Sequence, residues 1–179
     1  MARGFTLIEL LIAIGLTALL AGLAAPSFLP LSQTAQLDAQ SQRLIDALWY
    51  TRSQAISRNI PLTMRAVNQD WSNGWQIFTD ADQNGHPRDN DSILRANAAL
   101  PNGYSLSANQ GLGSTIGYRP DGRSARPGGG LQMGTFTLCS QSASAGLVAR
   151  EIIVISAAGR PRKSRAPSAL AERECNPSS

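Results

Sequence analysis

The chain has 179 residues, of which 16 are Lys or Arg and 12 are Asp or Glu, so its formal net charge at pH 7 is +4. This length leaves about one domain once an N-terminal apolar run is set aside, with enough residues to bury a core. The positive charge is concentrated in residues 119–179, which hold nine Lys or Arg against four Asp or Glu. One histidine and two cysteines are too few for a typical transition-metal site.

An apolar run begins near the N-terminus and continues to about Leu31. Glu9 is the only ionisable side chain between Phe5 and Leu31. About 20 helical residues at ~1.5 Å each span a hydrocarbon core of ~30 Å, which predicts a transmembrane helix over residues 5–31. A secretory signal peptide has a shorter apolar core. A charge within such a helix costs several kcal/mol unless it is paired, so Glu9 is a functional candidate.

The segment Gly4-Phe5-Thr6-Leu7-Ile8-Glu9 resembles the class III signal of type IV pilins and secretion-system pseudopilins. The resemblance implies a leader of residues 1–4 that prepilin peptidase removes after Gly4, and N-methylation of Phe5. It also implies that Glu9 aligns subunits during assembly by pairing with a neighbour's N-terminal amine. The expected location is the inner membrane, with the head in the periplasm, and then a pilus fibre at the cell surface. An ordinary uncleaved membrane anchor is the alternative.

The apolar pattern becomes amphipathic after residue 31. Four apolar residues fall at spacings compatible with one helical face, namely Leu37, Leu44, Leu48 and Ile56. The pattern predicts that the helix continues through residues 32–60. It should end near Arg58, because Pro61 disfavours helical geometry in the residue before it. Pro26 and Pro30 should kink or locally break the helix, since each lacks an amide donor.

Short apolar runs separated by turn residues replace the helical period after Pro61. The predicted strands are Leu62–Val67, Trp75–Thr79, Ser92–Ala96, Tyr104–Ala108, Ser114–Tyr118, Gly134–Cys139 and Glu151–Ser156. The predicted fold is α+β, with a long N-terminal helix packed on an antiparallel β-sheet or β-sandwich head of residues 61–179. Residues 71–80 and 152–160 resemble the GspH/FimT group of minor pilins and pseudopilins, which implies the type IV pilin-like form of this fold.

The two cysteines, Cys139 and Cys175, are expected to pair. An N-terminal anchor that exports the head would place both in an oxidising compartment, where disulfides persist. The chain-entropy relation gives a stabilisation of roughly 3 to 4 kcal/mol for a loop of this length. Two unrelated thiols are the alternative.

The acidic segment that begins at Asp80 matches the opening of a calcium loop. Asp80, Asp82 and Asn84 occupy alternate positions, and Asp91 falls where such a loop closes its coordination shell. A polar hairpin turn requires the same residue types, which is the competing interpretation.

His86 is the only histidine, and nothing in the sequence places a nucleophile beside it. We therefore expect neither an enzyme nor a cofactor.

The strongest functional candidate is the basic segment Gly159-Arg160-Pro161-Arg162-Lys163-Ser164-Arg165. Arg side chains bind phosphate oxygens in two-point fashion, and Lys acts as a point charge. Gly159-Arg160-Pro161-Arg162 resembles the Gly-Arg-any-Arg motif of DNA-binding minor pilins that serve natural transformation. By this resemblance Arg160 and Arg162 contact double-stranded DNA, and Lys163 and Arg165 extend the patch.

A second basic stretch precedes Gly128-Gly129-Gly130, and its Arg123 and Arg126 are further candidates for the DNA surface. The glycine run lacks the lysine and the Ser or Thr of a P-loop, so it is expected to be a flexible connection. Solvated loop charges are the alternative for the arginines.

The whole chain is thus expected to be a DNA-binding minor pilin for natural transformation (competence). The alternatives without DNA binding are a structural pseudopilin of a type II secretion system and a minor pilin that primes pilus assembly or adhesion.

Overall fold

The computed structural model describes residues 6–88, 90–142, 146–156, 158–164 and Cys175, with the backbone alone for residues 21–34, 141–142 and 146–154. The chain divides into two compact units, Met1–Gln36 and Leu37–Ser179. Helix α1 (Leu7–Arg58) contributes to both. Gly4, Phe5 and Arg165 lie outside the described residues.

The first unit contains the N-terminal part of α1. The Glu9 backbone N–H donates to the Thr6 hydroxyl at 3.3 Å, so Thr6 caps the helix three residues before Glu9. The large apolar side chains from Leu7 to Leu20 are exposed. Among the fully described residues, no helix combines the length and apolarity required to cross a membrane. The helix is uninterrupted at Pro26 and Pro30, so the predicted local break is absent.

The second unit begins with the amphipathic end of α1. Leu37, Leu44 and Leu48 are buried against the sheets, as their spacing predicts, but Ile56 is 44% exposed. The helix ends at Arg58, and Asn59 follows with a φ of 54°. The end of the helix before Pro61 is therefore confirmed.

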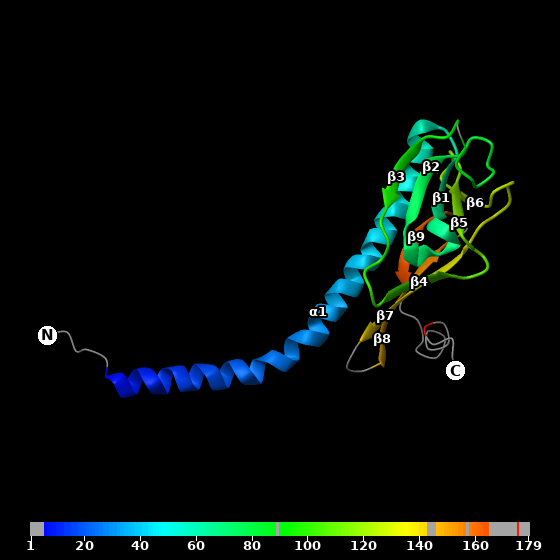
Figure 1. The fold of residues 1–179 in the computed structure, drawn as a ribbon. Helices are drawn as coiled ribbons and strands as arrows, with labels where there is room; N and C mark the ends of the chain where they lie inside the picture. The colour runs from blue at the N-terminus through cyan, green and yellow to red at the C-terminus, as the bar shows by residue number, and fades with distance from the viewer. Residues whose placement is uncertain (1–5, 89, 143–145, 157, 165–174, 176–179) are drawn as a thin grey trace. The chain divides into compact units, whose positions relative to one another are not determined.

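The head contains two antiparallel sheets (Figure 1). The five-stranded sheet has the order β3-β2-β1-β5-β6, and its strands are β1 (Leu62–Ala66), β2 (Trp75–Thr79), β3 (Ile93–Asn97), β5 (Thr115–Tyr118) and β6 (Ser124–Ala125). The four-stranded sheet has the order β4-β7-β8-β9, and its strands are β4 (Tyr104–Ala108), β7 (Gly134–Ser142), β8 (Gly146–Ile155) and β9 (Pro161–Ser164). The short 3-10 helices η1 (Val67–Gln69) and η2 (Trp71–Asn73) connect β1 to β2.

Both sheets share a core with the second half of α1. The largest fully buried side chains include Trp75, Phe78 and Phe136. The Trp71 ring of η2 and the Phe136 ring of β7 pack edge to face with centroids 4.8 Å apart, so η2 contacts the four-stranded sheet. This α+β architecture confirms the predicted fold class.

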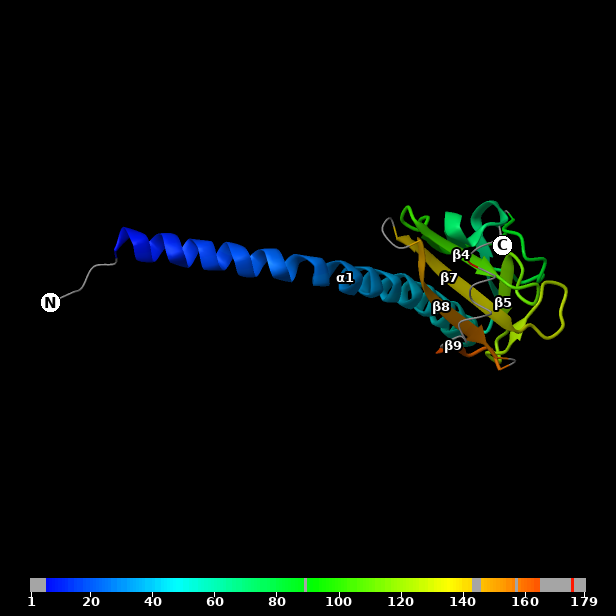
Figure 2. The same cartoon turned by 90° about the horizontal axis from the view of Figure 1, so that it is seen from below.

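All seven predicted strands occur, with boundary differences, but β6 and β9 were not predicted. β9 pairs antiparallel with β8 from Ile155 opposite Pro161 to Ile152 opposite Ser164. Figure 2 shows β9 at the edge of the sheet, beside β8. The basic segment is therefore an edge strand with a turn before it. Its charged residues gave no apolar alternation from which a strand could be predicted, because an edge strand can expose alternate side chains to water.

Candidate nucleic-acid interface

The turn between β8 and β9 holds the first part of the basic segment. The Gly159 N–H donates to the Ser156 carbonyl at 2.8 Å, and the Ser156 N–H donates to the Arg160 carbonyl at 3.3 Å. The Arg160 N–H donates to the Ser156 hydroxyl, also at 3.3 Å. These bonds fix the turn backbone, while the Arg160 side chain is exposed. A guanidinium on such a turn can reach a phosphate without the turn having to order first.

The cations of β9 do not share one face. Successive strand residues point to opposite sides of a sheet, which separates Arg162 from Pro161 and Lys163. Pro161 is buried, whereas Arg162 is exposed. The Lys163 ammonium lies 2.9 Å from the Asp38 carboxylate on α1. The structure therefore pairs Lys163 with the helix and separates it from Arg162, unlike the single patch expected from the sequence.

The turn between β5 and β6 holds the second basic stretch. The Arg119 N–H donates to the Arg123 carbonyl at 2.9 Å, and the Gly122 N–H donates back to the Arg119 carbonyl at 2.8 Å. Arg123 is exposed, with its Nε 3.8 Å from Asp121. This turn lies against Gly159 of the β8–β9 turn, next to Gly122. The fold thus brings together two basic stretches that are separate in the sequence.

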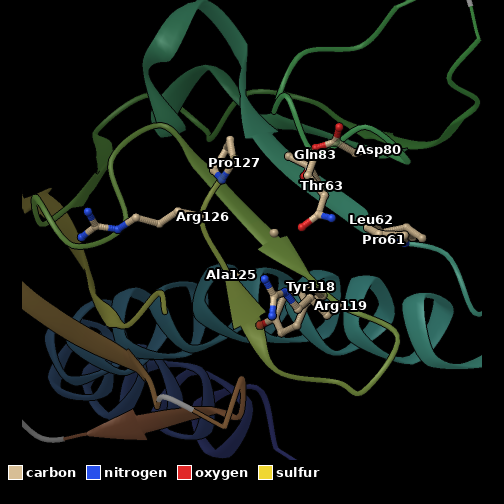
Figure 3. Close-up of a pocket in the computed structure, with 11 residues that line it drawn as sticks. Pro61, Leu62, Thr63, Asp80, Gln83, Tyr118, Arg119, Ala125, Arg126 and Pro127 are labelled. Atoms are coloured by element: carbon tan, nitrogen blue, oxygen red, sulfur yellow. The ribbon is translucent and has the colours of Figure 1, made fainter. Parts of the chain in front are cut away.

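A small cavity of about 10 Å³ lies beside this turn (Figure 3). Its lining residues include Thr63, Asp80, Tyr118 and Arg119. The Arg126 side chain extends away from Tyr118 and Arg119 in Figure 3. The cavity has room for about one water molecule, so it is too small for an organic ligand.

The Tyr118 hydroxyl is buried, and no described residue hydrogen-bonds it. Burial raises the pKa of Tyr118 above its ordinary value, an effect that the nearby Arg52 charge partly opposes. Because the folded state then keeps a proton that the unfolded state loses, this group lowers the stability as the pH rises above about 10.

We expect Tyr118→Phe to raise the free energy of unfolding by up to ~1 kcal/mol at pH 8, because it removes an unpaired buried hydroxyl. The gain should increase at pH 11, since the variant also lacks the titrating group. Urea unfolding of both proteins at the two pH values measures this difference. A variant that is less stable at both values would contradict the prediction.

The Cys139 and Cys175 sulfurs form a disulfide, with Cα atoms 5.8 Å apart. Cys139 lies on β7, an inner strand that pairs with β8, and Cys175 lies beyond β9. Both residues are buried. The bond therefore encloses the β8–β9 hairpin and its basic turn within one covalent loop.

The structure places three of the calcium candidates, Asp80, Asp82 and Asn84, in one hydrogen-bonded turn. The Asp80 carboxylate accepts hydrogen bonds from the Thr63 hydroxyl at 2.6 Å and from the backbone N–H groups of Asn84 and Gly85 at 2.9 and 3.0 Å. Asp82 instead contacts the Asn84 side chain, whose hydrogen bond is the main cause of a lowered pKa of Asp82.

Asp91 accepts a bond from the Arg88 N–H at 2.9 Å. Within the described ranges, no three His, Cys, Asp or Glu side chains are grouped to hold a metal ion. His86 is exposed in the same loop. The acidic segment thus forms a hydrogen-bonded turn.

A long N-terminal helix whose second half packs on antiparallel sheets defines a type IV pilin-like subunit. The chain belongs to the family described as Type II transport protein GspH, whose model matches residues 40–159. Residues 1–25 match the prokaryotic N-terminal methylation motif. The chain is therefore a GspH-type minor pilin or pseudopilin.

Solved structures of minor pilins and pseudopilins have a similar fold. Two crystal structures of the type IV minor pilin FimU from Pseudomonas aeruginosa (strain PAO1) each give a TM-score of 0.54 at 20% identity. The first match covers 73% of this chain and 97% of the FimU chain. The second covers 77% of this chain and 93% of the FimU chain. The minor pseudopilin EpsH from the type 2 secretion system of Vibrio cholerae gives 0.52 at 13% identity, covering 72% of this chain and 96% of EpsH. No curated protein matches the chain. These similar proteins are structural subunits rather than enzymes.

Proposed function

We propose that this chain is a minor type IV pilin that binds double-stranded DNA electrostatically and serves DNA uptake in natural transformation. The observation that carries the proposal is the pair of exposed arginines, Arg160 and Arg162, on a hydrogen-bonded turn and a paired strand. Guanidinium groups on a rigid backbone suit the regularly spaced phosphates of a duplex. The excess of cations in residues 119–179 adds a longer-range attraction.

Lys163 has a different part in this proposal. Its ammonium lies 2.9 Å from the Asp38 carboxylate on α1, and an exposed ion pair of this kind adds little to the stability of β9. Arg160 and Arg162 are then the main phosphate contacts, with Gly159 shaping the turn. Arg165 extends the patch by its place in the sequence.

The N-terminal part of the proposal concerns assembly. Prepilin peptidase cleaves after Gly4, Phe5 becomes the methylated N-terminus, and Glu9 aligns the subunit with neighbouring pilins. The match to the methylation motif over residues 1–25 supports this processing. The exposed apolar side chains from Leu7 to Leu20 need a nonpolar environment, which the inner membrane provides before assembly and other pilin helices provide in the fibre.

A gel-shift assay on the full-length protein in detergent tests the DNA site. We expect Arg160→Ala with Arg162→Ala to weaken binding to a 30-base-pair duplex at least tenfold at low salt, because two phosphate contacts are lost. The matched control is Arg58→Ala with Arg88→Ala, which removes the same charge from exposed positions elsewhere in the second unit. We expect this control to bind nearly as well as the wild type.

Two results would oppose the proposal. Equal binding by the two double variants would show that net charge, rather than this site, is what attracts DNA. Absence of wild-type binding even at low salt would favour a subunit without DNA binding. The family description, a type II transport protein, and the fold likeness to EpsH favour a secretion pseudopilin in that case.

A further inference from the structure

The β8–β9 turn contacts the β5–β6 turn through a residue that has to be glycine. Gly159 is buried and has a φ of 73°, a conformation that other residues rarely adopt. A Cβ atom at this position would lie 2.5 Å from the Gly122 carbonyl oxygen and 2.9 Å from the Ser124 nitrogen. These neighbours are backbone atoms, which cannot rotate away. The two turns can therefore approach this closely only while residue 159 lacks a side chain.

Side chains from two other elements hold the same junction. The Ser124 hydroxyl lies 3.4 Å from the Ser156 carbonyl of the β8–β9 turn and donates to the Gln132 carbonyl at 2.6 Å. The Arg52 Nε on α1 donates to the Gly122 carbonyl at 2.9 Å. The helix and both turns thus fix one another.

Arg123 and Arg160 flank this contact. Arg123 stands between Gly122 and Ser124, the two residues that Gly159 approaches, and Arg160 directly follows Gly159. Both arginines are exposed. The Asp121 carboxylate lies 3.8 Å from the Arg123 Nε. Exposed ion pairs of this kind are weak, so a phosphate can replace Asp121 as the partner of Arg123.

We infer that the DNA surface is formed by both turns, with Arg123 binding a phosphate beside Arg160 and Gly159 acting as the positioning residue that keeps the two turns together. This inference rests on the proposed DNA binding. It selects Arg123, which lies between the two residues that Gly159 approaches, over Arg126, which lies beyond β6. Because the junction is fixed before DNA binds, little ordering entropy opposes the second contact.

The first test replaces Arg123 by glutamine in the full-length protein and measures DNA affinity against salt concentration. Each phosphate contact contributes about one unit to the slope of log affinity against log salt. We expect Arg123→Gln to reduce that slope by about 1 and to weaken binding roughly threefold to tenfold at low salt. Arg88→Gln and Arg126→Gln remove the same charge and should keep the wild-type slope. A slope for Arg123→Gln equal to that of these controls would overturn the inference.

The second test concerns Gly159. Gly159→Ala keeps every cation but forces the turns apart, so it should weaken DNA binding several-fold. If Gly159 acts by holding Arg123 in place, adding Arg123→Gln to Gly159→Ala should cause little further loss. A full additional loss from Arg123→Gln in that background would contradict the positioning role. If Gly159→Ala does not fold, the salt slope of Arg123→Gln still decides whether Arg123 contacts DNA.

The results separate this inference from the proposed function. Absence of wild-type binding would remove both. Loss of binding in the Arg160→Ala, Arg162→Ala variant, together with a wild-type slope for Arg123→Gln, would leave the β8–β9 site and remove only the two-turn surface.

Discussion

Replacing Asp80 by alanine is expected to lower the free energy of unfolding by roughly 3 to 5 kcal/mol. The Asp80 side chain is only 1% exposed, and its carboxylate accepts three hydrogen bonds. Alanine would leave the Thr63 hydroxyl and the Gly85 N–H buried without an acceptor. A buried donor that loses its partner costs about 1 to 3 kcal/mol, and the lost side chain also leaves a void beside the small cavity.

Urea unfolding of the full-length protein, followed by tryptophan fluorescence, measures this loss. The matched control is Asp82→Ala, which removes the same charge from an exposed position of the same loop and should lower the stability far less than Asp80→Ala does. Similar losses in the two variants would contradict the role assigned to Asp80. A calcium-dependent rise in melting temperature that Asp80→Ala abolishes would instead support the calcium loop considered from the sequence.

Removing the disulfide is expected to have an effect of similar size. The two cysteines are separated by 36 positions. The chain-entropy relation gives a stabilisation of roughly 4 kcal/mol for closing a loop of that length. Cys139→Ala with Cys175→Ala should lower the free energy of unfolding by about that amount, because the unfolded chain regains the freedom that the bond removes.

Unfolding with and without reductant provides the measurement. The wild type should lose stability on full reduction, whereas the double alanine variant should not respond to reductant. The single variant Cys175→Ala should resemble the double variant, since either change breaks the bond. Wild-type stability that stays the same after complete reduction would contradict the prediction.

The helix and most strands could be predicted because their patterns are local. The spacing of Leu37, Leu44 and Leu48, together with Pro61, defined the amphipathic part of α1 and its end. Strand β9 could not be predicted in the same way. Its Arg162 and Lys163 look like a solvated basic segment, and only pairing with Ile152–Ile155 of β8 makes it a strand.

The candidate DNA site shows the same division. Sequence alone identified Arg160 and Arg162 as exposed cations near the C-terminus. It grouped Lys163 with them, although the alternation of side chains along β9 places Lys163 toward Asp38 on α1. The Gly-Arg pattern did not explain why residue 159 is glycine. The close approach of Gly159 to the Gly122 carbonyl supplies the reason.

The kind of subunit follows from local patterns along the chain. The N-terminal motif and the amphipathic helix depend on residues that are neighbours along the chain, and hydrophobic periodicity acts over the same short range. Which distant residues lie close together depends on the folding of the whole head. It brought the turn that carries Arg123 against the turn that carries Arg160, paired Lys163 with Asp38 and buried Asp80. These relations depend on sheet order and on close backbone contact, which no local pattern encodes.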